Sequence, residues 1–135
     1  MRNSTILVID DETDYLELMK GLLQQEGYSQ IITEQFPLKV MPLLEQHKID
    51  LILLDVYMPK INGMELLEKI TQTYPQIPII MITAVDELEI ALKAIKLGAY
   101  EYITKPPDTD RLFLTIKLGN GILSRSRHRC NPFDE

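Results

Sequence analysis

Polar side chains that can do chemistry stand where runs of apolar residues end. They are Asp10 and Asp11 after the first run, Asp55 after the third, Thr83 after the fourth and Lys105 after the fifth. Carboxylates that gather in one place repel one another, so a site built from them needs a cation. Oxygen ligands without histidine or cysteine favour Mg²⁺ or Mn²⁺ over zinc. A carboxylate nucleophile beside a divalent metal ion and a lysine forms an aspartyl-phosphate site.

The apolar runs predict the strands that position these side chains. The predicted strands are 5–9, 28–33, 51–54, 77–82 and 100–103. Continuous runs of branched aliphatic residues, such as 51–54, are typical of strands that are buried on both faces of a parallel sheet.

Helical spacing of apolar residues separates the strands. The first predicted helix is capped by Asp11 or Thr13 and ends at Gly27. The other four predicted helices are Phe36 to His47, Asn62-Gly63 to near Pro75, Asp86 to Gly98, and Asp108 or Thr109 to at least Leu123. Strand and helix alternate five times, which predicts a doubly wound α/β domain with helices on both faces of a parallel sheet. Since the carboxyl ends of parallel strands share one edge, the polar side chains are expected to converge there.

Length and composition fit one globular domain. A chain of 135 residues is long enough to bury a core. Its net charge of −6 argues against a nucleic-acid partner. The single cysteine, Cys130, excludes an internal disulfide and fits a reducing compartment. No apolar run approaches the ~20 residues of a membrane span. We therefore expect a cytoplasmic domain over residues 1–124, with 125–135 as a tail or the start of a linker.

Four motifs in chain order resemble the receiver domain of two-component response regulators. They are Ile9-Asp10-Asp11, Leu54-Asp55-Val56-Tyr57-Met58-Pro59 with Asn62-Gly63, Ile82-Thr83-Ala84, and the stretch from Gly98 to Pro106. The resemblance extends from Ile6 to about Leu123. It implies a flavodoxin-like fold whose five parallel strands have the order 2-1-3-4-5.

The resemblance also implies a role for each acid. Asp55 would take a phosphoryl group from a sensor histidine kinase or a phosphotransfer protein. Asp11, Asp55 and the backbone carbonyl of Tyr57 would bind Mg²⁺ (or Mn²⁺), with Asp10 acting largely through a bound water. The domain would then be a phosphoacceptor switch with intrinsic autophosphorylation and autodephosphorylation chemistry.

The remaining motif residues would read out the phosphoryl group. Thr83 would hydrogen-bond to it, and Ala84 is small enough to let it approach. Lys105 would pair with a phosphoryl oxygen, aimed by a cis peptide bond before Pro106. Tyr102 matches the aromatic switch residue of the family, which turns inward when Thr83 moves.

Two alternatives compete with the phosphoacceptor switch. A Mg²⁺-dependent aspartate-nucleophile phosphatase also uses a strand-end aspartate, but typically has a second acid two residues later, where this chain has Tyr57. A degenerate receiver used only for protein binding is disfavoured by the complete set of acids, hydroxyl and lysine. Taken alone, Asp10 and Asp11 would be read as acids in the first turn of a helix.

The last two helices and the fifth strand are predicted to form a surface for self-association or output contact. We expect Leu88, Ala91, Leu92 and Ile95 to face inward. The final helix has two apolar stripes, one of Leu112, Ile116 and Leu123 and one of Leu114, Leu118 and Ile122, so it should bury more than one face. One stripe would pack on the sheet, and the other would contact a second copy or an output domain.

The sequence leaves two alternatives for how the domain passes on its signal. Too few residues follow Leu123 for a DNA-binding motif, so we expect no direct nucleic-acid contact from this segment. The chain is either a stand-alone regulator or the amino-terminal part of a transcriptional regulator.

Overall fold

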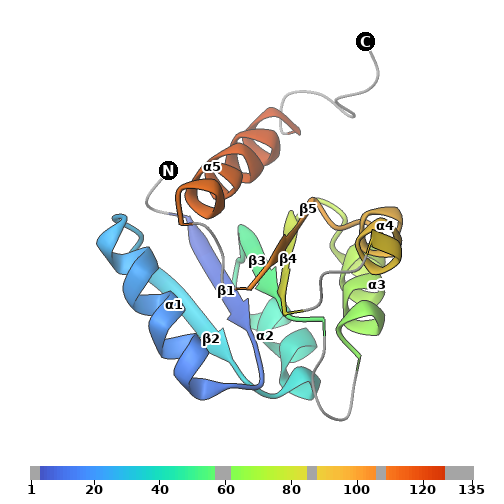
Figure 1. Cartoon of the computed structure of the whole chain (residues 1–135), viewed down its shortest axis with the longest axis horizontal. Coiled ribbons are helices and arrows are strands. Elements are labelled where there is room, and N and C mark those ends of the chain that lie inside the picture. Colours follow the sequence, from blue (N-terminus) through green and yellow to red (C-terminus); the bar gives the residue numbers. More distant parts are fainter. Residues whose placement is uncertain (1–3, 57–61, 85–87, 106–108, 127–135) are drawn as a thin grey trace.

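The structure is a computed structural model, and it describes residues 4–56, 62–84, 88–105 and 109–126. Five parallel strands form one sheet: β1 (Thr5–Ile9), β2 (Gln30–Glu34), β3 (Leu51–Leu54), β4 (Ile79–Thr83) and β5 (Glu101–Thr104). Their order is β2-β1-β3-β4-β5, with β2 and β5 at the edges. The predicted doubly wound, flavodoxin-like sheet is therefore confirmed (Figure 1).

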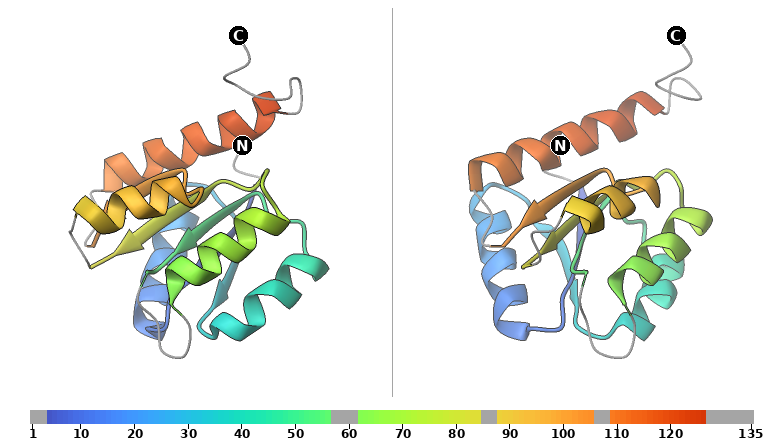
Figure 2. Two further views of the ribbon diagram at one scale, coloured as in Figure 1. Left: turned by 90° about the vertical axis from the view of Figure 1, so that its right-hand side faces the viewer. Right: turned by 45° about the vertical axis from the view of Figure 1, so that its right-hand side comes forward.

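Helices cover both faces of the sheet (Figures 1 and 2). They are α1 (Thr13–Gln25), the short 3₁₀ helix η1 (Pro37–Lys39), α2 (Val40–Gln46), α3 (Gly63–Thr73), α4 (Leu88–Lys96) and α5 (Thr109–Ser126). Helices α1 and α5 pack on one face, and α2, α3 and α4 pack on the other. Among the described helices, none combines the length and hydrophobicity that crossing a lipid bilayer requires.

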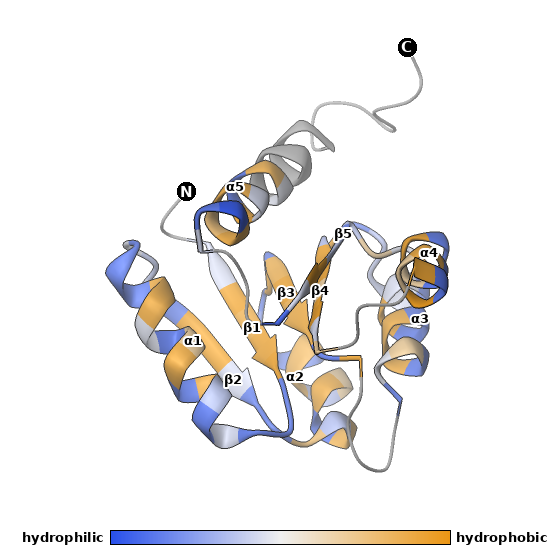
Figure 3. Cartoon of the chain, in the orientation of Figure 1, coloured by the Kyte–Doolittle hydropathy of each residue, from blue (hydrophilic) through white to orange (hydrophobic). Residues whose placement is uncertain are grey.

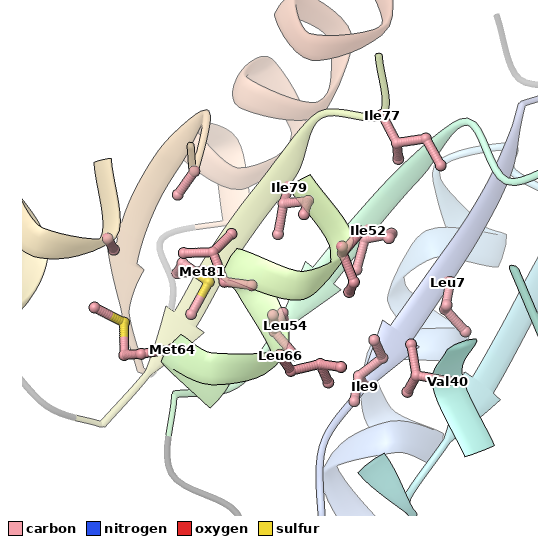
Figure 4. Close-up of a cluster of buried hydrophobic side chains, with 14 of the residues drawn as sticks. Leu7, Ile9, Val40, Ile52, Leu54, Met64, Leu66, Ile77, Ile79 and Met81 are labelled. Carbon is pink, nitrogen blue, oxygen red and sulfur yellow. The ribbon is translucent and has the colours of Figure 1, made fainter. Parts of the chain in front are cut away.

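Strands β1, β3 and β4 are buried on both faces because their residues are apolar without alternation (Figure 3). Successive side chains of a strand point to opposite faces. Leu7 and Ile9 accordingly join the cluster under α2 and α3 (Figure 4), whereas Ile6 and Val8 join the cluster under α1 and α5. Side chains of the central strands thus pack against helices on both faces of the sheet, and this packing fixes the position of the carboxyl edge of the sheet.

Helix starts differ in detail from the predictions. The helix that we predicted from Phe36 onward begins later, since α2 starts only at Val40 after the 3₁₀ turn. Pro42 therefore lies in the first turn, where no intrahelical partner for its missing N–H is needed. The predicted cap of α1 was wrong: Glu12 is the N-cap residue and makes no side-chain cap bond.

The prediction for the inward face of α4 was wrong for its three large residues, whereas Ala91 is half-buried. Leu88, Leu92 and Ile95 are 73%, 59% and 45% exposed. The sheet is instead covered by Ile90, Ala94 and Leu97, of which Ala94 is fully buried. Helix α4 has two apolar stripes, and the one containing the small Ala94 lets the helix approach the sheet more closely.

Helix α5 follows the predicted pattern over the part whose side chains are described. Leu112 and Ile116 are fully buried on the sheet, whereas Leu114 and Leu118 are more than half exposed. The helix continues to Ser126, beyond residue 124, where we placed the end of the domain. The proposed division at residue 124 stays a prediction.

Candidate functional site

Three carboxylates meet at the carboxyl edge of the sheet. Asp10 follows β1 and Asp55 follows β3, and these residues are only 1% and 6% exposed. Asp11 is half-buried beside them. One carboxylate oxygen from each of the three residues lies within 4.8 Å of the others. The strand ends thus bring together the acids that the sequence predicted.

Backbone hydrogen bonds fix the two buried acids. The Asp55 N–H donates to the Ile9 carbonyl over 3.1 Å, and the Asp10 N–H donates to the Glu34 carbonyl over 3.2 Å. The sheet ladder therefore extends one residue past the strands. The Asp10 Oδ1 atom accepts a bond from the Glu12 N–H at 2.9 Å, which turns the chain into α1. This bond holds the N-cap residue Glu12 and does not replace the helix cap that we had expected from Asp11 or Thr13.

Lys105 lies over these carboxylates. Its N–H donates to the Thr83 carbonyl at 2.7 Å, which continues the β4–β5 pairing. Its Nζ atom is 2.6 Å from Asp10 Oδ2 and 3.7 Å from Asp55 Oδ2. A third acid, the exposed Glu12, lies 4.0 Å from Nζ. One ammonium group thus faces the carboxylates of Asp10, Asp55 and Glu12. With Asp11 also in the cluster, the site keeps an excess of negative charge.

The sequence analysis did not connect Tyr15 with the site. The Lys105 Nζ atom lies 4.1 Å from the centroid of the Tyr15 ring. Burial, and then the charges of Asp10 and Asp55, raise the pKa of the Tyr15 hydroxyl. Its position two residues into α1, close behind the acidic pair, is the signal that could have pointed to it.

Thr83 and Ala84 lie where β4 ends. Thr83 is 1% exposed and pairs in register with Thr104 of β5, whereas Ala84 is exposed. Tyr102 lies opposite Met81 on the edge strand β5, half-buried against the cluster under α2 and α3. The predicted readout residues therefore lie on the two strands nearest α4.

Two predicted site residues, Tyr57 and Pro106, lie outside the described residues. The chain is described again from Asn62, whose Oδ1 atom accepts the Met64 N–H at 2.7 Å and caps α3. The Gly63 N–H donates to the Val56 carbonyl at 2.6 Å. The start of α3 is thus fastened directly to the end of β3, next to Asp55.

The donor set fits a hard divalent cation. It consists of carboxylate oxygens, and no histidine or cysteine belongs to this cluster in the described part of the chain. Mg²⁺ prefers a small number of carboxylates and retains waters or phosphate oxygens as its other ligands. With a lysine above it, the cluster suits a phosphoryl group whose negative charge needs both cations.

Comparison with known proteins gives consistent matches. The model of the response regulator receiver domain matches residues 6–117. The nitrogen assimilation regulatory protein NtrX of Azorhizobium caulinodans is 38% identical over 109 residues, which are 79% of this chain and 24% of that protein. The transcriptional regulatory protein ZraR of Klebsiella oxytoca is 33% identical over 111 residues, which are 82% of this chain and 25% of that protein. The chain spans about a quarter of the length of these curated relatives.

A solved structure agrees over the whole fold. The CheY-like response regulator receiver domain protein of Methanospirillum hungatei superposes with a TM-score of 0.85 at 30% sequence identity. The match covers 92% of this chain and 98% of that one.

Proposed function

Because this chain belongs to the family of response regulator receiver domains, we propose that Asp55 is its phosphoacceptor. The family acts in two-component signal transduction, and its members interact with histidine kinases or phosphotransfer proteins. The observation that carries the proposal is the buried Asp55 carboxylate at the end of β3, with two further acids beside it and the Lys105 ammonium 3.7 Å away.

The reaction transfers a phosphoryl group from a phosphohistidine of the partner. A bond forms between phosphorus and an oxygen of Asp55 while the bond between phosphorus and the imidazole nitrogen breaks. The imidazole, protonated on its other nitrogen, leaves as a neutral ring. Asp55 is suited to attack because its backbone is fixed by the ladder bond to Ile9.

The surrounding charges assist this transfer. Asp10, Asp11 and Asp55 would hold Mg²⁺, the ion that fits the donor set. A bound Mg²⁺ supplies positive charge that offsets the charge of the phosphoryl oxygens. Lys105 places a second positive charge within reach of Asp55. The metal role of the Tyr57 carbonyl and the cis peptide bond before Pro106 remain predictions, because both residues lie outside those described.

The signal would leave through β4 and β5. Thr83 would hydrogen-bond to the phosphoryl group, with Ala84 small enough to allow its approach. Tyr102 would respond to the movement of Thr83, since both residues lie on the adjacent strands β4 and β5. Chemistry at the sheet edge would thereby alter the surface formed by α4, β5 and α5.

That surface is the one we assign to a partner. Leu88, Leu92 and Ile95 of α4 are exposed, and so are Leu114 and Leu118 of α5. A row of large apolar side chains at i, i+4 and i+7 is a helix face that usually packs against something. We propose that it contacts a second copy of the chain or an output domain.

The rest of the protein is inferred from the relatives. NtrX and ZraR are named as regulatory proteins, and this chain matches about a quarter of each. We propose that the domain is the amino-terminal part of a transcriptional regulator and makes no direct contact with nucleic acid. A phosphatase is not favoured, because the matches are to response regulators and Tyr57 replaces the second acid of such enzymes.

Incubation with acetyl phosphate and Mg²⁺, followed by intact mass measurement, tests the proposal. The wild-type chain should gain the mass of one phosphoryl group, and EDTA should prevent the gain. Asp55→Asn should abolish the adduct, whereas the exposed Asp14→Asn should retain it. An adduct that persists in Asp55→Asn, or the lack of any adduct on the wild-type chain, contradicts the proposal.

A further inference from the structure

The Tyr15 ring contacts Lys105 of the site, but the proposed chemistry gives this ring no role. Tyr15 belongs to the first turn of α1, and Lys105 follows β5, so 90 residues of sequence separate them. The Lys105 ammonium lies 4.1 Å from the ring centroid, well within the ~6 Å of a cation–π contact. The same ammonium is the one that reaches Asp10 and Asp55.

The contacts of Tyr15 with the described residues are made by its ring and not by its hydroxyl group. Its side chain packs against the apolar cluster under α1 and α5. Its hydroxyl oxygen is buried and has no hydrogen-bond partner within the described part of the chain. The contact that singles out this side chain is therefore the ring face against the lysine.

An aromatic ring restrains an ammonium group without neutralising it. A lysine side chain has a flexible four-carbon stem and loses rotamer freedom when it is held in one place. The Asp10 carboxylate also holds the Lys105 ammonium, at 2.6 Å. However, this ion pair offsets the positive charge that Lys105 would otherwise present to a phosphoryl group. The ring attracts the cation through its quadrupole and leaves the full positive charge available.

We propose that Tyr15 is a positioning residue for phosphoryl transfer, whose ring face keeps the Lys105 ammonium over Asp55 as it turns from Asp10 toward the phosphoryl oxygens. The inference rests on Asp55 being the phosphoacceptor. It concerns the ring and assigns no part to the hydroxyl.

Two variants of Tyr15 separate the ring from the hydroxyl. Tyr15→Phe keeps the ring, and Tyr15→Leu fills similar space without it. With acetyl phosphate, the rate of Asp55 phosphorylation in Tyr15→Leu should fall about five- to tenfold, as expected for a partly buried cation–π contact. Tyr15→Phe should stay within about twofold of the wild-type rate. A fall in Tyr15→Phe as large as that in Tyr15→Leu overturns the proposal.

A merely structural role is excluded by two further measurements. The Mg²⁺ concentration for half-maximal rate should not change in Tyr15→Leu, because the carboxylates stay in place. In a double-mutant cycle, adding Tyr15→Leu to Lys105→Met should cause no further loss. An equal loss with and without Lys105, or a shifted Mg²⁺ dependence, overturns the proposal. Phe36→Leu is the matched control, since the Phe36 ring lies 5.0 Å from the ammonium of Lys39, which is not part of the site.

An NMR measurement distinguishes this inference from the proposed function. Ring current from Tyr15 should shift the ε-methylene protons of Lys105 upfield in the wild-type chain and in Tyr15→Phe, but not in Tyr15→Leu. This result needs no phosphorylation. If the wild-type chain gains no phosphoryl group, the proposed function fails even where the shift is observed. If the chain is phosphorylated but the shift is the same in all three proteins, only the role of Tyr15 fails.

Discussion

At the scale of single residues, Lys105 balances charges that the fold has buried. Asp10 is 1% exposed and Asp55 is 6% exposed, and Lys105 Nζ is within 4.0 Å of both. Removal of one partner of a buried ion pair leaves the other charge uncompensated, which costs more than the pair contributes. Mg²⁺ that binds the folded state stabilises it by mass action.

Lys105→Met should therefore lower the free energy of unfolding in EDTA by roughly 2–4 kcal/mol, as the uncompensated carboxylates repel one another. Millimolar Mg²⁺ should restore more stability to this variant than it adds to the wild-type chain. Urea unfolding of both proteins with and without Mg²⁺ measures the difference. Lys69→Met, at an exposed position on α3, is the control and should change little. Equal Mg²⁺ effects on both proteins would contradict a metal site next to Lys105.

Tyr15 predicts a dependence of stability on alkaline pH. Its pKa in the folded chain is raised above the ordinary value of 10.0, first by burial and then by Asp10 and Asp55. A raised folded-state pKa means that the unfolded chain loses its proton first, so the contribution is complete below pH 10 and is lost as pH rises above it.

The comparison of wild type with Tyr15→Phe isolates this effect, since other tyrosines and lysines titrate in both proteins. Between pH 10 and 12, the wild-type chain should lose stability faster than Tyr15→Phe. Below pH 9, Tyr15→Phe should be at least as stable as wild type, because no intramolecular hydrogen bond of the hydroxyl is lost among the described residues. Parallel stability curves for the two proteins would rule out the raised pKa.

Sequence reasoning located the acids but not the tyrosine. Asp10, Asp55 and Lys105 could be placed because strand ends share an edge, which depends only on topology. The contact of Tyr15 with Lys105 depends on the direction in which α1 leaves the sheet. The turn into α1 contains the hydrogen bond between Asp10 Oδ1 and the Glu12 N–H, which is a detail of side-chain geometry with no periodic pattern.

At the scale of elements, the start of α3 supports the end of β3. A Cβ atom on Gly63 would lie 2.1 Å from the Asp55 carbonyl oxygen and 2.6 Å from that of Val56. Both are backbone atoms, so no side chain can turn away to make room. The glycine is required by the close approach of the two segments.

Gly63→Ala should destabilise the domain by about 2 kcal/mol or more, because the backbone around Asp55 must move. It should also slow Asp55 phosphorylation, since the acceptor carboxylate moves with that backbone. Gly21→Ala is the opposite case: nothing lies within 4 Å of the added Cβ, and alanine should stabilise α1 by up to about 1 kcal/mol. Urea unfolding of both variants measures the changes in the free energy of unfolding. An unchanged free energy of unfolding in Gly63→Ala would refute the close approach.

Helix α4 shows where element-level prediction stops. The presence of the helix and its stop near Gly98 could be predicted, since Gly98 has a φ of 117° that favours glycine. The face that packs on the sheet could not, because two apolar stripes fit the same helical period. In the structure the stripe that contains Ala94 packs on the sheet, whereas Leu88 and Leu92 of the other stripe are exposed to solvent.

At the scale of the whole molecule, two strands connect the edge of the sheet that carries the acidic cluster with the exposed apolar residues of α4. β4 ends at the site in Thr83, and β5 ends next to Lys105. β5 is the edge strand beside α4. A shift at Thr83 and Tyr102 would therefore reach the surface made by Leu88, Leu92 and Ile95 without passing through the core under α1.

This connection predicts that phosphorylation strengthens contact between two copies. Identical surfaces meet most simply around a twofold axis, so one apolar substitution weakens the contact from both sides. Leu92→Gln should leave the free energy of unfolding within about 0.5 kcal/mol of wild type, because the side chain is 59% exposed. Acetyl phosphate and Mg²⁺ should induce self-association of the wild-type chain, and Leu92→Gln should reduce it.

Sedimentation velocity over a range of concentrations measures this association. The matched control is Leu38→Gln on η1, whose side chain is 71% exposed. The η1 helix follows β2, which lies at the opposite edge of the sheet from β5. The control should associate as the wild-type chain does, since its leucine is equally apolar but belongs to another surface. Two results would count against the α4 surface as the contact between copies. One is undiminished association of Leu92→Gln, and the other is an equal loss in Leu38→Gln, which would point to general hydrophobic attraction.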